Sequence, residues 1–249
     1  MTDPLDILAF AAHPDDAEIG CGGSLLLAAD QGRRVAVADM SAGEMSTRGT
    51  LPQRRQETEA ASKLLGLSAR LSLGLPDGYI GTDADHRMAV IDVIRATRPR
   101  IVLAPFWEDR HPDHVAAGKL VREACFFAGV QKMGSGTPHR PENVYYYMLH
   151  HPFQPTFVID IAKVWARKQA AMAAYASQFQ AVDDGPQTAI SQSGFGRFLE
   201  ARSIYFGAMI GAAYGEPFYS PGPIALDLFP ESVSASPAPG QLPAYSVWR

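Results

Sequence analysis

Short apolar runs alternate with segments of helical periodicity over about the first 130 residues of the chain. The apolar runs predict strands, and the segments between them, whose apolar positions recur every three or four residues, predict helices. In chain order we expect strands at 6–12, 35–40, 71–73 and 101–104, and helices at 22–31, 53–65, 87–96 and 113–128. This alternation is typical of an α/β, Rossmann-like fold with a mostly parallel sheet and helices on both faces.

The pattern is less regular in the second half of the chain. Strands are predicted at 144–148 and 156–161 and helices at 163–175 and 198–210, which form a smaller C-terminal α/β extension. From Pro217 onward proline, serine and glycine dominate, so we expect a loop or an arm there. The predicted organisation is therefore one domain over residues 1–218 and a Pro-rich tail over 219–249.

Composition and charge narrow the classes of partner. With 249 residues and 47% hydrophobic content, the chain can bury a sizeable core. The isoelectric point near 6.0 argues against a nucleic-acid partner, because phosphate binding usually needs a basic face. The longest apolar runs fall short of the roughly 20 residues that a membrane-spanning helix needs. We expect neither nucleic acid nor membrane as a partner.

The two cysteines, Cys21 and Cys125, are too few for a disulfide framework. We expect both to be small buried side chains, with metal ligation by either as the alternative. Asp3 and Asp6 stand where a secretory signal would carry Lys or Arg. These features predict a cytoplasmic protein in a reducing compartment.

Two clusters of histidine and aspartate follow predicted strands. His13-Pro14-Asp15-Asp16 comes after the first strand, and His111-Pro112-Asp113-His114 comes after the fourth. In the usual strand order 3-2-1-4-5 these two strands are neighbours, and ligands bind beyond the carboxyl ends of such strands. Residues about a hundred positions apart are therefore expected to meet in one site.

The residue types in these clusters predict a hydrolytic metal site. Catalytic zinc takes three protein ligands and leaves one position for water, and two imidazoles with one carboxylate satisfy that number. The remaining carboxylate is then free to act as a base. Spacing leaves open whether Asp15 or Asp16 binds the metal, and whether His111 or His114 does.

Two non-metal interpretations compete with this one. His-Pro-Asp segments also form turns in which Asp caps the next helix, and a binding module built that way would hold no stoichiometric zinc. Glycines Gly20, Gly22 and Gly23 raise a nucleotide-binding hypothesis, but they do not fit G-x-G-x-x-G and no P-loop lysine follows.

The motifs taken together resemble the LmbE/PIG-L family of zinc-dependent N-deacetylases. The resemblance rests on residues 12–16 with Glu18 and Gly20–Gly23, then Gly43-Glu44, Arg54-x-x-Glu57 and residues 111–114. Later segments, at 145–148, 151–153, 198–202 and 214–218, are most similar to the bacillithiol biosynthesis deacetylases. The resemblance covers the chain to about Phe218.

What the resemblance implies for the metal is specific. His13, Asp16 and His114 are expected to bind Zn²⁺, and Asp15 is expected to be the general base. Fe²⁺ or Co²⁺ could occupy the same set of two histidines and one carboxylate.

The resemblance also implies roles around the substrate. His111 is expected beside the reacting carbonyl as a cationic donor, oriented by Asp113. Arg54 is expected to face the substrate, and Glu57 to brace Arg54 or the fold.

Other arginines lie in segments predicted near the carboxyl edge of the sheet, and we interpret them as ordinary surface residues; they are Arg48, Arg55, Arg110 and Arg140. His86, His139, His150 and His151 have no partner at convincing ligand spacing and are left outside the site.

The function implied is removal of the N-acetyl group from N-acetylglucosaminyl malate in bacillithiol biosynthesis by a zinc-dependent hydrolase. The alternative is a deacetylase or amidase of the same family for another N-acetylated sugar or a thiol conjugate. The expected partner is thus a small N-acetylated glucosaminyl substrate. The resemblance also implies a homo-oligomer, with a hexamer as one form.

Overall fold

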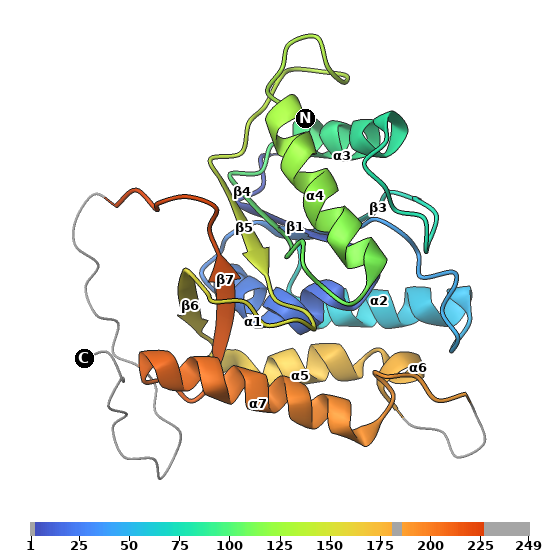
Figure 1. Cartoon of the computed structure of the whole chain (residues 1–249), viewed down its shortest axis with the longest axis vertical. Helices are drawn as coiled ribbons and strands as arrows, with labels where there is room; N and C mark the ends of the chain where they lie inside the picture. Colours follow the sequence, from blue (N-terminus) through green and yellow to red (C-terminus); the bar gives the residue numbers. More distant parts are fainter. Residues whose placement is uncertain (1–2, 181–185, 227–249) are drawn as a thin grey trace.

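Seven strands form one mixed sheet in the computed structural model, which describes residues 3–180 and 186–226 (Figure 1). Their order is β3-β2-β1-β4-β5-β7-β6, and the first five run parallel. The strands are β1 (Ile7–Ala11), β2 (Val35–Asp39), β3 (Ala69–Ser72), β4 (Ile101–Pro105), β5 (Asn143–Tyr147), β6 (Phe157–Asp160) and β7 (Gly215–Tyr219). The parallel part reproduces the predicted order 3-2-1-4-5, so the α/β prediction is confirmed.

Helices cover both faces of the sheet (Figure 1). Helices α3 (Ala84–Thr97) and α4 (Pro112–Phe127) pack on one face. The other face carries α1 (Asp16–Asp30), α2 (Leu51–Leu65), α5 (Trp165–Ala173), the short α6 (Ala176–Phe179) and α7 (Ser193–Ile210), with a 3-10 turn η1 (Ala162–Val164) before α5.

Alternation along the strands builds a separate core on each face. In β1, Leu8 and Phe10 point into the core under α3 and α4, whereas Ala9 and Ala11 point into the core under α1. All four side chains are fully buried, as expected for a central parallel strand covered on both sides. Cys21 and Cys125 are buried and free, which confirms that prediction.

Helix α1 begins at Asp16, six residues before the predicted start. Glycines lower helix propensity, which is why the sequence pattern placed the start later. The glycines are explained by packing: a Cβ on Gly20 would lie 2.1 Å from the ring of Tyr147, and one on Gly23 would lie 2.8 Å from Ile161. They therefore allow close packing of α1, a role unrelated to nucleotide binding.

Strand β7 corrects the prediction that the chain is loop or arm from Pro217 onward. Pro217 pairs with Val158 of β6, and β5 pairs only with Phe218 and Tyr219. Proline is tolerated here because it lies where β7 has a neighbour on one side only. Of the predicted tail at 219–249, Tyr219 belongs to β7 and residues 227–249 lie outside the described residues.

The C-terminal elements are joined to α1 by buried polar contacts. The Glu216 carboxylate accepts hydrogen bonds from the backbone N–H groups of Gly23 and Ser24, both at 2.7 Å, and from Lys168 Nζ at 2.6 Å. Ile19 O accepts from Lys168 Nζ and from Arg202. The extension is thus part of the same packed body as the helix that begins at Asp16.

Among the described residues, no helix combines the length and apolar character that crossing a membrane requires.

Candidate active site

The two His/Asp clusters meet at the carboxyl edge of the sheet, as the strand order predicts. β1 and β4 pair in parallel, with Ile7 opposite Ile101, so the loops that follow them leave the sheet side by side. The ring of His13 lies 4.8 Å from that of His111 and 5.4 Å from that of His114, measured between centroids.

Asp16 lies between two of these imidazoles. Its Oδ2 is 3.5 Å from His13 Nδ1, and its Oδ1 is 3.2 Å from His114 Nε2. The backbone N–H of His13 also donates to Asp16 Oδ2, which fixes the carboxylate at the first turn of α1. Although burial opposes ionisation, the neighbouring histidines hold the pKa of Asp16 well below its usual range.

The outer nitrogen of each of these two imidazoles is held by a carboxylate. His13 Nε2 lies 3.2 Å from Asp113 Oδ2 and 3.2 Å from Asp77 Oδ1. His114 Nδ1 lies 2.9 Å from Asp109 Oδ1. A carboxylate on the outer nitrogen fixes the proton there and leaves the inner nitrogen as a lone-pair donor. Both inner nitrogens face Asp16.

This donor set fits a divalent metal ion. The two inner nitrogens and the Asp16 carboxylate supply two imidazoles and one carboxylate, and the outer nitrogens have the carboxylate partners that metal-bound histidines usually have. The site is also rich in negative charge, since Asp15, Asp16, Asp77, Asp109 and Asp113 all lie around it. Burial works against the charged imidazole, but Asp16 and Asp109 outweigh it and raise the pKa of His114 to about 9.

Asp15 adjoins this set in a strained backbone conformation. It is the N-cap of α1 with φ 117°, a left-handed value that is unusual for a residue other than glycine and that often marks functional sites. Its Oδ2 lies 3.1 Å from Arg54 Nη2. Burial raises the pKa of Asp15 to about 7, against the opposing effect of Arg54. Such a carboxylate is suited to exchange a proton near neutral pH.

Arg54 is fixed beside Asp15, whereas Glu57 braces the fold. Arg54 Nη2 also donates to the carbonyl oxygen of Pro14, but its Nε and Nη1 are buried without a protein partner. Glu57 accepts hydrogen bonds from the backbone N–H and the hydroxyl of Ser177, each at 2.7 Å. Of the two expected roles for Glu57, its hydrogen bonds to Ser177 support bracing of the fold and not of Arg54.

His111 and Asp113 contact each other in a way that differs from the expectation. The backbone N–H of Asp113 donates to His111 Nδ1 at 3.2 Å, while the Asp113 carboxylate contacts His13 Nε2 and accepts from the N–H of Gly78. With Nδ1 accepting, the proton of a neutral imidazole is on Nε2. Burial, with His114 and His13 nearby, lowers the pKa of His111, so these contacts favour the neutral ring over the expected cation.

Three residues of the site were missed by sequence reasoning. Asp77 follows β3 in the segment Pro76-Asp77-Gly78, which indicates only a turn. Asp109 lies two residues before His111, and its closeness to the cluster was the one available signal. His150, which we had left outside the site, lies with its Nδ1 3.0 Å from Asp109 Oδ1.

The remaining arginines divide between two ends of the sheet. Arg48 is buried and donates to the carbonyl oxygen of Gln180, so its interpretation as a surface residue is wrong. Arg110 is exposed at the cavity over the histidines and has no ion-pair partner among the described residues. Arg140 packs on Phe126 at the end of α4, before β5 begins, and so lies away from the predicted carboxyl edge.

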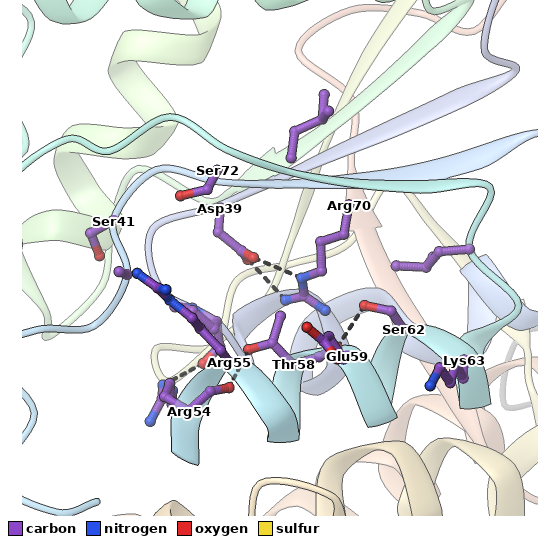
Figure 2. Close-up of a pocket in the computed structure, with 14 residues that line it drawn as sticks. Asp39, Ser41, Arg54, Arg55, Thr58, Glu59, Ser62, Lys63, Arg70 and Ser72 are labelled. Atoms are coloured by element: carbon purple, nitrogen blue, oxygen red, sulfur yellow. Dashed lines mark hydrogen bonds and ion pairs between the residues drawn. The ribbon is translucent and has the colours of Figure 1, made fainter. Parts of the chain in front are cut away.

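Two cavities flank Arg54. One, of about 430 Å³, contains the chemistry: it is lined by His13, Asp15, Asp16, Asp77, Arg110, His111, His114 and His150. The larger, of about 660 Å³, lies between α2 and the edge strand β3. Figure 2 shows Thr58, Glu59 and Ser62 of α2 below the Asp39–Arg70 ion pair in this second cavity, with Arg54 and Arg55 toward one end of the helix and Lys63 toward the other. No histidine lines it, so the smaller cavity is the candidate active site.

Comparisons with known proteins agree with this geometry. The family model for PIG-L, described as GlcNAc-PI de-N-acetylase, matches residues 8–125. A diacetylchitobiose deacetylase of Thermococcus kodakarensis is 31% identical over 232 residues, which cover 87% of this chain and 83% of that protein. The chain belongs to the PIG-L/LmbE family. The resemblance inferred from the motifs is thereby confirmed at the level of the family, and so is the prediction of an enzyme that hydrolyses N-acetyl amide bonds.

Other proteins similar to this chain have been given different names. The crystal structure of the conserved protein TT1542 from Thermus thermophilus superposes with a TM-score of 0.83 at 38% identity, covering 91% of this chain and 99% of that one. A probable N-acetyl-α-D-glucosaminyl L-malate deacetylase 2 of Bacillus cereus is 27% identical, covering 71% and 84%. A 4-oxalmesaconate hydratase of Pseudomonas putida is 30% identical, covering 69% and 73%. Family membership alone therefore does not name the substrate.

Proposed function

We propose that this protein removes the N-acetyl group of a glucosamine conjugate, with a divalent metal held by His13, Asp16 and His114. The observation that carries the proposal is the Asp16 carboxylate between the inner nitrogens of His13 and His114, whose outer nitrogens are each held by a carboxylate. A turn or helix cap would need no such arrangement. A divalent ion such as zinc, when bound, supplies a Lewis acid and eases deprotonation of water near neutral pH.

Asp15 is the residue proposed to take the proton from the attacking water. Its Oδ2 is engaged by Arg54, whereas Oδ1 has no hydrogen-bond partner among the described residues, and Asp15 lines the cavity of about 430 Å³. The raised pKa of Asp15 suits a group that must both accept and return a proton. Arg54 fixes the orientation of the carboxylate in the cavity.

His111 is proposed to stabilise the oxygen of the former carbonyl. Its Nδ1 accepts the N–H of Asp113, so its Nε2 carries the proton and acts as the donor even when the ring is neutral. Removing one such donor typically costs about two to three decades in rate. The leaving amine takes its proton from Asp15 or from His111, and pH–rate profiles of Asp15→Asn and His111→Ala distinguish the two by which variant loses the basic limb.

Unpaired positive charge supports N-acetylglucosaminyl malate as the substrate. Arg110 is exposed at the cavity with no ion-pair partner among the described residues, and Arg54 Nε and Nη1 are buried without a partner. Arginine binds carboxylates with two parallel hydrogen bonds, and malate brings two carboxylates. Arg54 already has Asp15 as its counter-charge, so a neutral sugar such as diacetylchitobiose would leave Arg110 without one.

The test is amine release from N-acetylglucosaminyl malate, diacetylchitobiose and N-acetylglucosamine, with the metal content of the same sample quantified. We expect preference for the malate conjugate, loss of activity on chelation, and a raised KM for that conjugate alone in Arg110→Met. Arg140→Met, at the far edge of the sheet, is the matched control. Equal turnover of all three compounds would mean that the substrate is another sugar conjugate and not the malate conjugate. Water addition to 4-oxalmesaconate without amine release would overturn the deacetylase activity itself.

The metal identity, the cytoplasmic location and assembly into a homo-oligomer remain predictions. Metal analysis of the protein as purified and light scattering of the full chain test the first and the last.

A further inference from the structure

His150 is held rigidly beside the candidate metal site although it belongs to neither His/Asp cluster. Its Nδ1 lies 3.0 Å from Asp109 Oδ1, and its backbone N–H donates to Asp109 Oδ2 at 2.8 Å. Its ring is parallel to that of His114 within 6°, with 5.4 Å between centroids. These contacts fix both the position and the rotation of the imidazole.

The contacts also determine where the proton of His150 lies. An ionised carboxylate can only accept hydrogen bonds, so Asp109 requires a proton on His150 Nδ1. In the neutral ring, Nε2 is then an acceptor. That atom has no hydrogen-bond partner among the described residues and is not sealed from solvent, and His150 lines the cavity of about 430 Å³.

His111 presents the opposite character to the same cavity. Its Nδ1 accepts a backbone N–H, so its Nε2 is a donor. The cavity therefore offers a donor imidazole at His111 and an acceptor imidazole at His150. A sugar that carries an acetamide carbonyl and free hydroxyl groups needs this combination, since the carbonyl accepts and a hydroxyl can donate.

We propose that His150 is a substrate-binding residue whose Nε2 accepts a hydrogen bond from a hydroxyl group of the sugar. The proposal rests on the proposed function and adds a specificity-determining contact to it. A purely structural role is already served by the backbone, since the N–H groups of His150 and His151 both reach Asp109. A role as an additional metal ligand would use nitrogens of His114 and His150 that are directed at Asp109, and it predicts a second ion per chain.

Two variants of His150 test the roles of its two ring nitrogens separately. His150→Asn keeps an amide N–H near the position of Nδ1, where it can still donate to Asp109, and removes Nε2. His150→Gln places an amide group near the position of Nε2 and can restore an acceptor there. His151→Asn is the matched control, because its side chain is exposed and has no hydrogen bond or ion pair among the described residues.

The experiment combines these variants with N-acetylglucosamine and its 3-, 4- and 6-deoxy analogues, on metal-loaded protein. We expect His150→Asn to lower kcat/KM for the parent sugar by roughly 5- to 100-fold, the range for an unmet buried hydrogen bond. With the wild type, one deoxy analogue should show kcat/KM lowered by the same factor relative to N-acetylglucosamine. With His150→Asn, removal of that hydroxyl should lower kcat/KM no further. We expect His150→Gln to recover part of the activity, and metal content to stay at one ion per chain.

Separate outcomes overturn the two claims. If the wild type deacetylates these sugars but every analogue loses activity equally in wild type and His150→Asn, the contact with His150 is wrong and the proposed function stands. Loss of metal in His150→Asn, or two ions per wild-type chain, would also overturn the contact of His150 with the sugar and would indicate that His150 belongs to a metal site. Saturation-transfer NMR of glucosamine and its deoxy analogues tests, by binding and without turnover, whether His150 and one sugar hydroxyl act together. A wild type that releases no amine from these sugars or from N-acetylglucosaminyl malate overturns both claims.

Discussion

The Asp113 carboxylate lies 3.2 Å from Nε2 of His13, a residue a hundred positions earlier in the chain. Each cluster therefore completes the other: the first contributes His13 and Asp16 on one loop, and the second orients His13 from the neighbouring strand. The first loop alone could not fix the tautomer of His13, whereas Asp109 fixes that of His114 from within the second loop. This dependence explains why a site of this kind needs two adjacent strands that leave the sheet at the same edge.

Replacing His13 and replacing Asp15 should have different effects on the metal. We predict that His13→Ala loses both bound metal and activity, because it removes a proposed ligand, whereas Asp15→Ala keeps the metal and loses about two to four decades in rate. Metal content by atomic spectrometry, measured beside amine release, separates the two. Near-normal turnover in either variant would refute these assignments.

Asp109 should matter for metal affinity although it is not a proposed ligand. It holds His114 Nδ1 at 2.9 Å. Loss of such a partner typically weakens metal binding by roughly 10- to 100-fold, which we expect for Asp109→Ala in competition with a chromogenic chelator. The neighbouring Glu108 is exposed and has no hydrogen bond or ion pair among the described residues, and Glu108→Ala serves as the control. Identical affinities of the two variants would contradict the role given to Asp109.

Gly20 and Gly22 should respond differently to the same added methyl group. A Cβ on Gly20 would lie 2.1 Å from Tyr147 Cδ2, so we expect Gly20→Ala to destabilise the protein by about 1–3 kcal/mol through overpacking. A Cβ on Gly22 meets nothing closer than 3.6 Å, and alanine there gains helix propensity of up to about 1 kcal/mol. Urea unfolding of both variants measures the difference. Equal midpoints would mean that α1 moves away from Tyr147 at little cost.

Cys125 should make stability depend on alkaline pH. Burial raises the pKa of Cys125 to about 12, against about 8.5 for an exposed thiol. Between these values the folded state holds a proton that the unfolded state has lost, so the free energy of unfolding falls as pH rises, by about 1.4 kcal/mol per pH unit for this group. Urea unfolding at several pH values from about 9 to 11 should therefore show a shallower decline in Cys125→Ala. Parallel declines in the two proteins would refute this.

The part of the site that could be predicted from sequence depends on local patterns and one topological rule. The runs that form β1 and β4 are apolar and end at His-Pro-Asp segments, and the usual strand order then brings His13 and His111 together. Asp77 and His150 follow no such rule. Their partners, His13 and Asp109, are 64 and 41 residues away and follow different strands, so no ligand spacing connects them.

In the fold, too, some elements follow from local sequence patterns and others from contacts between residues far apart in the chain. Most predicted helices and strands are present because their periodicity is encoded within each segment. The glycine-rich start of α1 packs against Tyr147, which is more than a hundred residues away, and β7 pairs with β6 across about 60 residues. A glycine-rich segment and a strand containing Pro217 therefore have weak local signals, and only their tertiary partners make them regular.

The contact of Glu216 with α1 also determines when this helix can be stabilised while the chain is being synthesised on the ribosome. Its carboxylate binds the backbone of α1 at Gly23, 193 residues earlier in the chain. Translation thus completes α1, which carries Asp16, long before the side chain that secures this helix is made. Because distant contacts form only after both partners have emerged, the nascent chain is expected to bind metal tightly only once β7 has left the exit tunnel.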